Sequence, residues 1–286
     1  MKILVTGKNS FIGRYFKENN KLDQIEEVCL VENNIDAIDF SRFDVVFHVA
    51  AIVHQSKHIS EEYFFKINSD LAYNVAKKAK EMGVKHFVFM STVKVYGENN
   101  SKNNVWTETS KCYPQDAYGR SKLDAENRFK VLNDEEFVIS IVRTPVVYGS
   151  GVKGNIQRIA KFVLNSKLIP LGGIENKRAM VNIANLNSLV NRIIELRRGG
   201  LFLAGDKNLL STSEFVQYLI KYVRGRKYMI NFPRVLKILV KLILPKFYIK
   251  IFGTMLIDNK MTCKQLDFTP PCTEEEGLKQ VIEFIR

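Results

Sequence analysis

The chain lacks the features that would carry it into or across a membrane. None of its apolar stretches approaches the roughly 18–20 uninterrupted residues that a spanning helix requires. The apolar run at the N-terminus, Ile3–Thr6, is too short for the core of a secretory signal, and no small-residue cleavage pattern follows it. We therefore expect a cytoplasmic protein that touches, at most, the inner face of the membrane.

Cysteine is scarce and scattered. The four cysteines form no C-x-x-C pair, and none has a histidine at the spacing of metal ligands; they are Cys29, Cys112, Cys263 and Cys272. Isolated thiols of this kind are typical of a reducing compartment. The sequence therefore predicts neither a disulfide framework nor a metal site.

Acidic residues are outnumbered by basic ones. The chain has 43 Lys and Arg against 30 Asp and Glu, which gives a net charge of +13. Such an excess suits nucleic acid, an anionic membrane surface or acidic small molecules as partners, and lysine-rich codon usage would also produce it. Because no nucleic-acid-binding motif accompanies the charge, we expect no nucleic-acid partner.

Short apolar runs alternate with segments of helical period in the first half of the chain. The runs that predict strands are Ile3–Thr6, Val28–Val31, Val45–Ala50, Phe87–Met90 and Val138–Arg143. The segments that predict helices are Ile12–Asn19, Tyr63–Met82 and Ala117–Leu132. This alternation indicates βαβ units and a parallel sheet, and runs without polar alternation suit strands that are covered on both faces.

The second half is less regular. Val181–Leu196 predicts a strand and a helix, while Ser213–Arg224 and the end of the chain after Pro270 and Pro271 predict further helices. We predict an α/β fold: a Rossmann-type doubly wound parallel sheet with a smaller C-terminal substrate-binding domain. The dinucleotide-binding domain is expected to cover 1–150, with 179–197 returning to it. The substrate-binding domain is expected to cover 151–178 and 198–286.

A glycine-containing segment, Thr6–Gly13, joins the first predicted strand to the first predicted helix. Gly7 and Gly13 allow a tight turn and a close approach to a pyrophosphate at the helix N-terminus. Glu32 closes the predicted second strand, where a carboxylate can accept hydrogen bonds from an adenosine ribose. Two glycines after a strand also suit a plain βα turn, and the order strand, loop, helix, strand, acid argues against that alternative.

Tyr118 and Lys122 form a Y-x-x-x-K motif, whose spacing places both side chains on one face of a helix. An ammonium near a phenol stabilises the phenolate and can lower its pKa. Ser91 and Thr92 directly follow a predicted strand and so lie at the carboxyl edge of the sheet, where ligands bind. A hydroxyl, a tyrosine and a lysine together predict acid–base chemistry at this edge.

These motifs together resemble a known family. TGKNSFIG, the HVAA run at His48–Ala51, Asn68, MSTVKVYG, YGRSK and VRTPVVYG occur in the order and spacing of the extended short-chain dehydrogenases/reductases, the sugar-nucleotide epimerase, dehydratase and reductase group. The resemblance covers nearly the whole chain. Within the group the chain most resembles enzymes that reduce UDP-2-acetamido-2,6-dideoxy-4-ketohexoses, together with UDP-hexose 4-epimerase-like proteins of polysaccharide biosynthesis.

The resemblance implies roles for individual residues. Thr92 would be the catalytic hydroxyl, Tyr118 the acid and base, and Lys122 its partner. The implied cofactor is NAD(H) or NADP(H), and its expected contacts are Gly7, Ser10, Phe11, Ile12, Gly13, Glu32, Asp36, Ala50, Ala51, Asn68, Tyr118, Lys122 and Pro145. The implied partner is a UDP-sugar, and its expected contacts are Thr92, Lys94, Tyr118, Asn155 and Arg178. A homodimer stays an open expectation.

The chain departs from the family pattern at four places. Ser10 stands where the family usually has its middle glycine, the segment between the second and third predicted strands is short, and Leu266-Asp267-Phe268 replaces the family's L-G-W. The 4,6-dehydratases of the family carry an Asp-Glu pair after the strand-end threonine, and this chain has Val93 and Lys94 there. Because valine and lysine cannot supply that acid and base, dehydration is disfavoured.

Three functions stay open. The first is an NAD(P)-dependent 4-keto reductase of a UDP-2-acetamido-2,6-dideoxy-hexos-4-ulose. The second is a UDP-hexose or UDP-N-acetylhexosamine 4-epimerase that keeps its NAD bound. The third is a non-catalytic nucleotide-sensing protein on the same fold, since a fold does not fix a function. The complete set of Thr92, Tyr118 and Lys122 argues against the third.

One segment, 233–252, is strongly apolar with spaced basic residues and no acidic residue. If helical, it would carry Arg234, Lys237 and Lys241 on one stripe. A basic amphipathic helix of this kind can lie in an anionic membrane interface. The alternative is a helix of the C-terminal domain with its apolar surface packed inside and its lysines in solvent.

Overall fold

Six parallel strands form the central sheet. The computed structural model describes the chain except for residues 21–23, 31–33, 54–58 and 102–103. In spatial order the strands are β2 (Gln24–Val28), β1 (Lys2–Thr6), β3 (Val45–His48), β4 (His86–Thr92), β5 (Val138–Thr144) and β9 (Gly200–Leu203). Every neighbouring pair is parallel, so the predicted α/β class with a parallel, doubly wound sheet is confirmed.

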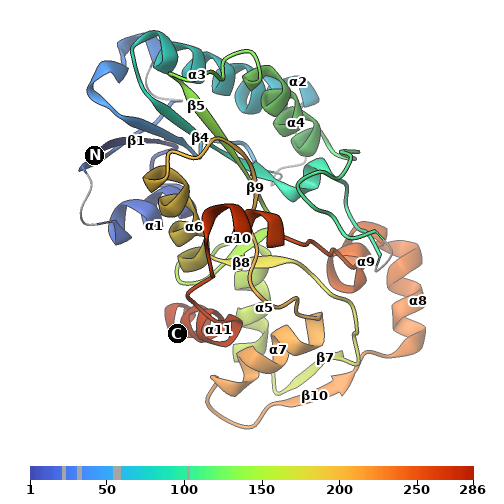
Figure 1. Ribbon diagram of the computed structural model, residues 1–286. Coiled ribbons are helices and arrows are strands. Elements are labelled where there is room, and N and C mark those ends of the chain that lie inside the picture. Colours follow the sequence, from blue (N-terminus) through green and yellow to red (C-terminus); the bar gives the residue numbers. More distant parts are fainter. Residues whose placement is uncertain (21–23, 31–33, 54–58, 102–103) are drawn as a thin grey trace.

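Helices cover both faces of this sheet (Figure 1). The α-helices of the whole described chain, including those of the smaller unit below, are α1 (Phe11–Asn19), α2 (Glu61–Phe65), α3 (Ala72–Glu81), α4 (Ala117–Phe129), α5 (Asn155–Asn165), α6 (Ile183–Glu195), α7 (Thr212–Lys221), α8 (Arg234–Ile243), α9 (Pro245–Phe252), α10 (Lys260–Leu266) and α11 (Glu274–Ile285). Alternate strand residues point to opposite faces, so Ile3 lies in the core beside α1 and α6, and Leu4 lies in the core beside α3 and α4. Burial on both faces explains the near-continuous apolar runs.

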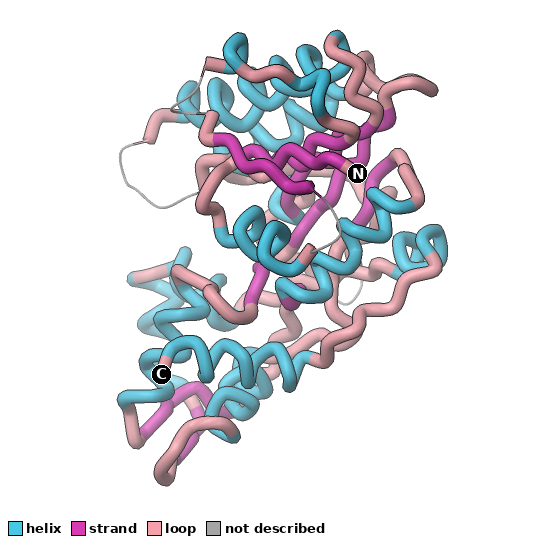
Figure 2. The backbone as a smooth tube through the Cα atoms, turned by 90° about the vertical axis from the view of Figure 1, so that its left-hand side faces the viewer, coloured by secondary structure: helices cyan, strands magenta, loops and turns pink. Residues whose placement is uncertain are grey.

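A smaller unit lies beyond the carboxyl edge of the sheet, in the lower half of Figure 2. It contains two parallel two-stranded sheets, β6 (Val146–Tyr148) with β8 (Met180–Asn182) and β7 (Leu168–Gly172) with β10 (Tyr228–Asn231). Its core draws on α5, α7 and α11. Capping boxes open α7 at Ser211 and α11 at Thr273, close to where the sequence predicts these helices to begin.

The sheet reverses its strand order at β1. From β1 the chain passes first to β2 on one side and then to β3 on the other, so the topological switch point lies at the carboxyl ends of β1 and β3. Ligands bind at such switch points in open α/β sheets. The turns after β1 and β3 meet closely there, because a Cβ added to Gly7 would lie 2.9 Å from the amide nitrogen of Ala50.

Two predictions about this sheet are wrong. The second strand is Gln24–Val28 and not Val28–Val31, because β2 is an edge strand with polar outward positions, and a search for an unbroken apolar run misses it. The boundary at residue 198 is also misplaced: β9 pairs with β5 as the last strand of the main sheet, so the sheet domain extends past 197.

The predicted helix at 63–82 is interrupted. Helices α2 and α3 are joined by a π-helical stretch, Lys66–Leu71, which contains the buried Asn68. A single π turn inside a helix often marks a functional region. Here it sets the position of the Asn68 amide.

The segment 233–252 forms two short helices, α8 and α9, that pack against each other at the outer side of the smaller unit (Figure 1). All ten residues of α8 are described, and none of them is buried. The interpretation of this segment as a packed core helix is therefore wrong, because its apolar side chains face outward.

Candidate active site at the carboxyl edge of the sheet

The turn after β1 is shaped for a close backbone approach. Gly7 has φ of +98°, in the left-handed region that glycine adopts without strain. Its N–H and that of Lys8 both donate to the Val28 carbonyl of β2, at 3.0 and 3.2 Å. The turn is thus fixed between the ends of β2 and β3, and the first turn of α1 follows directly.

Ser10 caps helix α1. Its hydroxyl accepts a hydrogen bond from the Gly13 N–H at 3.1 Å, and its backbone is extended, so this position does not need glycine. The serine that replaces the family's middle glycine therefore has a local role. It also occupies one of the N–H groups that a helix N-terminus offers to an anion.

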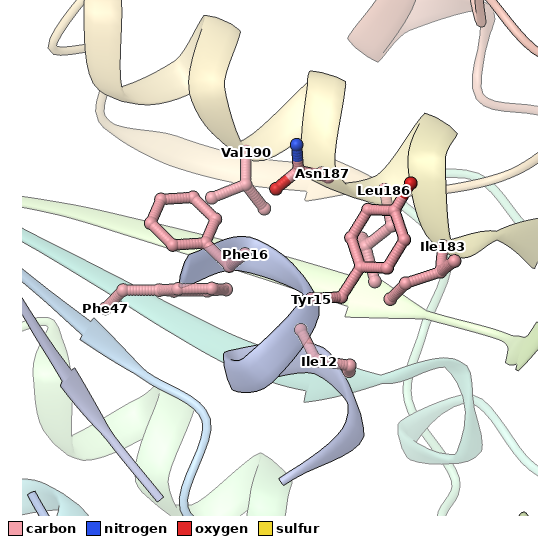
Figure 3. A pocket seen from close by; sticks show the side chains of 8 residues that line it. All are labelled: Ile12, Tyr15, Phe16, Phe47, Ile183, Leu186, Asn187 and Val190. Carbon is pink, nitrogen blue, oxygen red and sulfur yellow. The ribbon is translucent and has the colours of Figure 1, made fainter. Parts of the chain in front are cut away.

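Phe11 and Ile12 turn their side chains into the protein. Ile12 packs with other α1 residues against α6, in the contact that Figure 3 shows, and Phe11 reaches the cores on both sides of the helix start. Their first-turn N–H groups have no acceptor within the helix. If these residues contact a cofactor as predicted, they do so through the backbone. Gly13 brings α1 close to β1, since a Cβ there would lie 3.1 Å from Val5 Cγ1.

The structure gives little support to the two acidic residues assigned to the adenosine end of the cofactor. Glu32 lies outside the described residues, and β2 ends at Val28, so Glu32 does not close that strand. Asp36 lies in a short 3-10 turn, where its carboxylate is 82% exposed and 3.1 Å from the Lys78 ammonium. An adenine contact from Asp36 stays a prediction.

The segment after β3 is held by Asn68. Its side-chain oxygen accepts from the Ile52 N–H at 2.8 Å, and its amide nitrogen donates to the Ile52 carbonyl at 3.1 Å and to Ser121 Oγ at 3.1 Å. The amide therefore ties the partly buried Ala50 and Ala51 turn to helix α4. This buried asparagine fixes the segment after β3 at the carboxyl edge of the sheet.

Thr92 and Tyr118 come together as the sequence predicts. Thr92 ends β4 and Tyr118 lies in the first turn of α4, and the Thr92 hydroxyl is close enough to the phenol to influence its pKa. Burial raises the pKa of Tyr118 to about 12, although the Thr92 hydroxyl acts in the opposite direction. The phenol is therefore protonated at neutral pH in this state, poised as a proton donor.

Lys122 lies one turn further along α4 and is fully buried. Its ammonium donates to the Met90 carbonyl at 2.9 Å and lies 4.3 Å from the centre of the Phe89 ring. Burial lowers the pKa of Lys122 to about 7, although the nearby Glu126 carboxylate raises it. The expectation that Lys122 lowers the pKa of Tyr118 does not hold here, because the ammonium faces Met90 and burial dominates at the phenol.

A buried ion pair behind Lys122 escapes prediction from the sequence. Glu126 and Arg143 are 3% and 5% exposed, with a shortest N–O distance of 2.5 Å. Ser91 donates to the same carboxylate, and the Arg143 guanidinium lies 4.6 Å from the centre of the Tyr96 ring. Two signals could have indicated the pair: Glu126 is four residues after Lys122, and Arg143 is a charge within an apolar strand.

Lys94 is already paired. Its ammonium hydrogen-bonds the Asp116 carboxylate and lies 3.6 Å from Glu98. Asp116 also caps α4 by accepting from the Gly119 N–H at 2.7 Å. A substrate contact from Lys94 stays a prediction, and it would require sharing the ammonium with these two carboxylates.

The remaining predicted residues lie on separate elements. Pro145 is buried between β5 and β6, and Asn155 is exposed as the first residue of α5. The Arg178 guanidinium donates to the Ile249 and Gly253 carbonyls at 3.0 and 3.1 Å, at the C-terminal end of α9. Burial lowers the pKa of Arg178, and the Glu98 charge opposes this effect. A diphosphate contact from Arg178 stays a prediction.

The chain matches known proteins over most of its length. The sequence profile described as the NAD dependent epimerase/dehydratase family matches residues 3–202. The chain belongs to this family. A UDP-glucose 4-epimerase of Vibrio cholerae is 32% identical over 248 residues, which are 84% of this chain and 76% of that protein. A UDP-2-acetamido-2,6-beta-L-arabino-hexul-4-ose reductase of Pseudomonas aeruginosa is 25% identical over 245 residues, which are 79% of this chain and 59% of that protein.

The fold of this family member is also that of solved structures. RMD from Pseudomonas aeruginosa, complexed with NADPH, superposes with a TM-score of 0.78 at 15% identity, over 100% of this chain and 99% of that one. The predicted family is confirmed, and the predicted cofactor class, NAD(H) or NADP(H), follows from it.

The carboxyl edge fits the phosphate end of such a dinucleotide. The Gly7 turn leaves no room for a side chain, and the start of α1 presents first-turn N–H groups that have no acceptor within the helix. Lys122 supplies a buried ammonium at the end of β4. The backbone from Gly7 to Ile12 would hold the diphosphate, and Lys122 would hold a ribose. At the adenosine end, of the two acids assigned there only Asp36 lies among the described residues.

Proposed function

We propose that this protein is an NAD(P)-dependent reductase of the 4-keto group of a UDP-2-acetamido-2,6-dideoxy-hexos-4-ulose. The observation that carries the proposal is that Thr92, which ends β4, and Tyr118, in the first turn of α4, meet at the carboxyl edge of the sheet, with Lys122 buried one turn further along α4. Val93 and Lys94 follow the threonine, so the acid and base for dehydration are missing from those positions. The reductase from Pseudomonas aeruginosa supports the substrate class.

The side chains divide the proton chemistry among them. When bound, the cofactor supplies the hydride at its nicotinamide ring. Tyr118, whose pKa of about 12 keeps its proton in place, donates that proton to the oxygen at carbon 4 as the carbonyl is reduced. The Thr92 hydroxyl lies close to the phenol and orients it. Lys122, whose ammonium donates to the Met90 carbonyl, holds a ribose hydroxyl of the cofactor in this scheme and does not act on the phenol directly.

Two features support a cofactor that exchanges between turnovers. Ser10 occupies the Gly13 N–H, which reduces the donors available to a diphosphate. Between β2 and β3 the described residues form two 3-10 turns, Ile35–Ala37 and Phe40–Arg42, and Asp36, the acid assigned to the adenine, is largely exposed. Weaker holding suits a reductase, which must release its oxidised cofactor.

The second candidate is a UDP-hexose 4-epimerase. The 32% identity to the Vibrio cholerae 4-epimerase favours it. The same Thr92 and Tyr118 pair would serve, with Tyr118 first accepting and then returning the proton. Surface polysaccharide biosynthesis in the cytoplasm, the setting that the family resemblance implies, belongs to either proposal.

One experiment separates the two. The purified protein is incubated with UDP-4-keto-6-deoxy-GlcNAc and either NADH or NADPH, while the absorbance of the reduced nicotinamide is followed. A reductase consumes one equivalent of reduced cofactor per product. Conversion of UDP-glucose or UDP-GlcNAc to its 4-epimer without net change in absorbance would identify the epimerase. If the protein binds the cofactor but converts neither class of substrate, both proposals are wrong.

A further inference from the structure

Helices α8 and α9 expose an unusual concentration of apolar side chains. Eight large apolar residues between 235 and 247 are more than two-fifths exposed: Val235, Leu236, Ile238, Leu239, Leu242, Ile243, Leu244 and Phe247. Val235, Leu242 and Ile243 reach 70% or more. A surface helix normally turns such a stripe toward the core, so α8 has the opposite orientation. A contiguous exposed apolar surface of this kind marks a binding site.

Basic residues are spaced along the same two helices. Arg234, Lys237 and Lys241 follow one another at helical spacing on α8, and Lys246 and Lys250 add to them on α9, with no acidic residue from 233 to 252. The Lys237 ammonium lies 5.1 Å from the centre of the Phe252 ring, and the Lys241 ammonium lies 6.0 Å from that of Tyr248. Lys237 and Lys241 are thus held beside the apolar stripe, on the side of α9.

The helix pair is tied firmly to the smaller unit at the end of α9. The Arg178 guanidinium bonds two of its terminal carbonyls, and the Asn176 amide donates to the Ile251 and Gly253 carbonyls at 3.1 and 2.9 Å. The Thr212 hydroxyl donates to Ile251 at 2.7 Å. Helix α8 itself lies at the right-hand edge of the molecule in Figure 1, and none of its residues is buried.

We propose that α8 and α9 bind the surface of an anionic lipid bilayer. An apolar stripe flanked by cations is the pattern of a helix that lies in the interface, with its apolar side chains among the acyl chains and its lysines at the headgroup phosphates. No helix in the part of the chain that the structure describes is long and apolar enough to cross a membrane. The helices therefore lie on the bilayer, parallel to its plane.

Charge argues against a second copy of the chain as the occupant. Two copies that met through this face would bring their five basic residues together, ten in all, with no acidic partner from either segment. Like charges brought together in this way repel each other. An anionic bilayer supplies both negatively charged headgroups for the lysines and an apolar interior for the exposed apolar side chains.

The test is co-sedimentation of the purified protein with vesicles. The probes are phosphatidylcholine alone and phosphatidylcholine mixed equally with phosphatidylglycerol, at low and high salt. We expect wild type to sediment with the anionic vesicles at low salt and to be released by high salt. Lys237→Glu with Lys241→Glu should lower the partition coefficient by at least about tenfold, because each cation near the surface contributes to binding. Ile238→Gln with Leu242→Gln should also lower the partition coefficient, since these side chains are expected to insert among the acyl chains.

A matched control reverses two exposed lysines elsewhere. Lys161→Glu with Lys264→Glu, on α5 and α10, makes the same change in net charge and should leave binding within about twofold of wild type. All six positions are exposed, so folding should be kept, and thermal unfolding checks this. Wild type that stays in the supernatant overturns the proposal. Equal losses in the control overturn it too, since they indicate non-specific attraction. A dimer that the glutamine pair dissociates, without vesicle binding, assigns the surface to a second copy instead.

Discussion

At the scale of single residues, burial controls the chemistry of the site more than the choice of side chain does. The motif places Tyr118 and Lys122 on one face of α4, and desolvation then moves their pKa values in opposite directions, up for the phenol and down for the ammonium. Both shifts favour the neutral forms. The neutral phenol is the form that can donate a proton.

The first prediction concerns proton donation. Tyr118→Phe removes the phenol proton but keeps the ring, so folding and cofactor binding should be unchanged while turnover falls by about 10²–10⁴. Initial rates on the 4-keto substrate measure this. Tyr113→Phe, at a tyrosine that is 66% exposed, is the matched control and should have wild-type activity. Near-normal turnover by Tyr118→Phe would remove Tyr118 from the mechanism.

The second prediction concerns the ion pair behind Lys122. Glu126→Gln leaves the Arg143 guanidinium buried without its carboxylate, which should lower the free energy of unfolding by about 3–5 kcal/mol. Urea unfolding measures the change. As a control, Glu81→Gln breaks an exposed ion pair with Lys77 and should lower the free energy of unfolding by less than about 1 kcal/mol. Similar small losses for both variants would mean that the buried pair has little part in stability.

At the scale of elements, each functional group is set by where a strand ends and a helix begins. Strands β1, β3 and β4 end at the same edge, and α1 and α4 begin there with side-chain caps, Ser10 and Asp116. The caps have different consequences. Asp116 also binds Lys94, whereas Ser10 uses an N–H group of the helix that would receive the diphosphate.

The third prediction concerns that cap. Ser10→Gly frees the Gly13 N–H and should tighten cofactor binding several-fold, while stability falls by only a few tenths of a kcal/mol, since glycine is itself tolerated at an N-cap. Quenching of intrinsic fluorescence by NADH and NADPH gives the dissociation constants. Ser10→Ala is the matched comparison and should lower the free energy of unfolding by about 1 kcal/mol. Weaker binding by Ser10→Gly would show that the hydroxyl itself contacts the cofactor.

At the scale of the whole molecule, the sheet buries several ionisable groups in their neutral form. His48 and His86 lie in strands β3 and β4 and are fully buried. Burial, with the Lys122 charge, lowers the pKa of His48 to about 3; burial, with the Arg197 charge, lowers that of His86 to about 4. Their acceptance of a proton on unfolding links the stability of the fold to pH.

The fourth prediction follows from the sign of this linkage. Below pH 6.5 the unfolded chain protonates both histidines and the folded chain does not, so stability should fall as the pH falls toward 4, by a few kcal/mol in total. Lys122 acts in the same sense between about pH 10 and 7. Urea unfolding from pH 8 to 5 measures the slope. In His48→Asn the slope below pH 6.5 should be shallower, and an unchanged slope would show that His48 is not among the groups responsible.

The sequence by itself determined the parallel α/β class, the glycine turn after β1 and the meeting of Thr92 with Tyr118, because these depend on short-range patterns and on the rule that parallel strands end at one edge. The edge strand β2 and the boundary after residue 197 escaped it, since β2 is largely polar, and β9 is a four-residue strand whose pairing with β5 is a long-range contact. Only the tertiary structure decided that Glu126 meets Arg143, that Lys122 faces Met90, and that α8 faces outward. Each of these depends on which side chains burial brings together from distant parts of the chain, and the local pattern of residues does not carry that information.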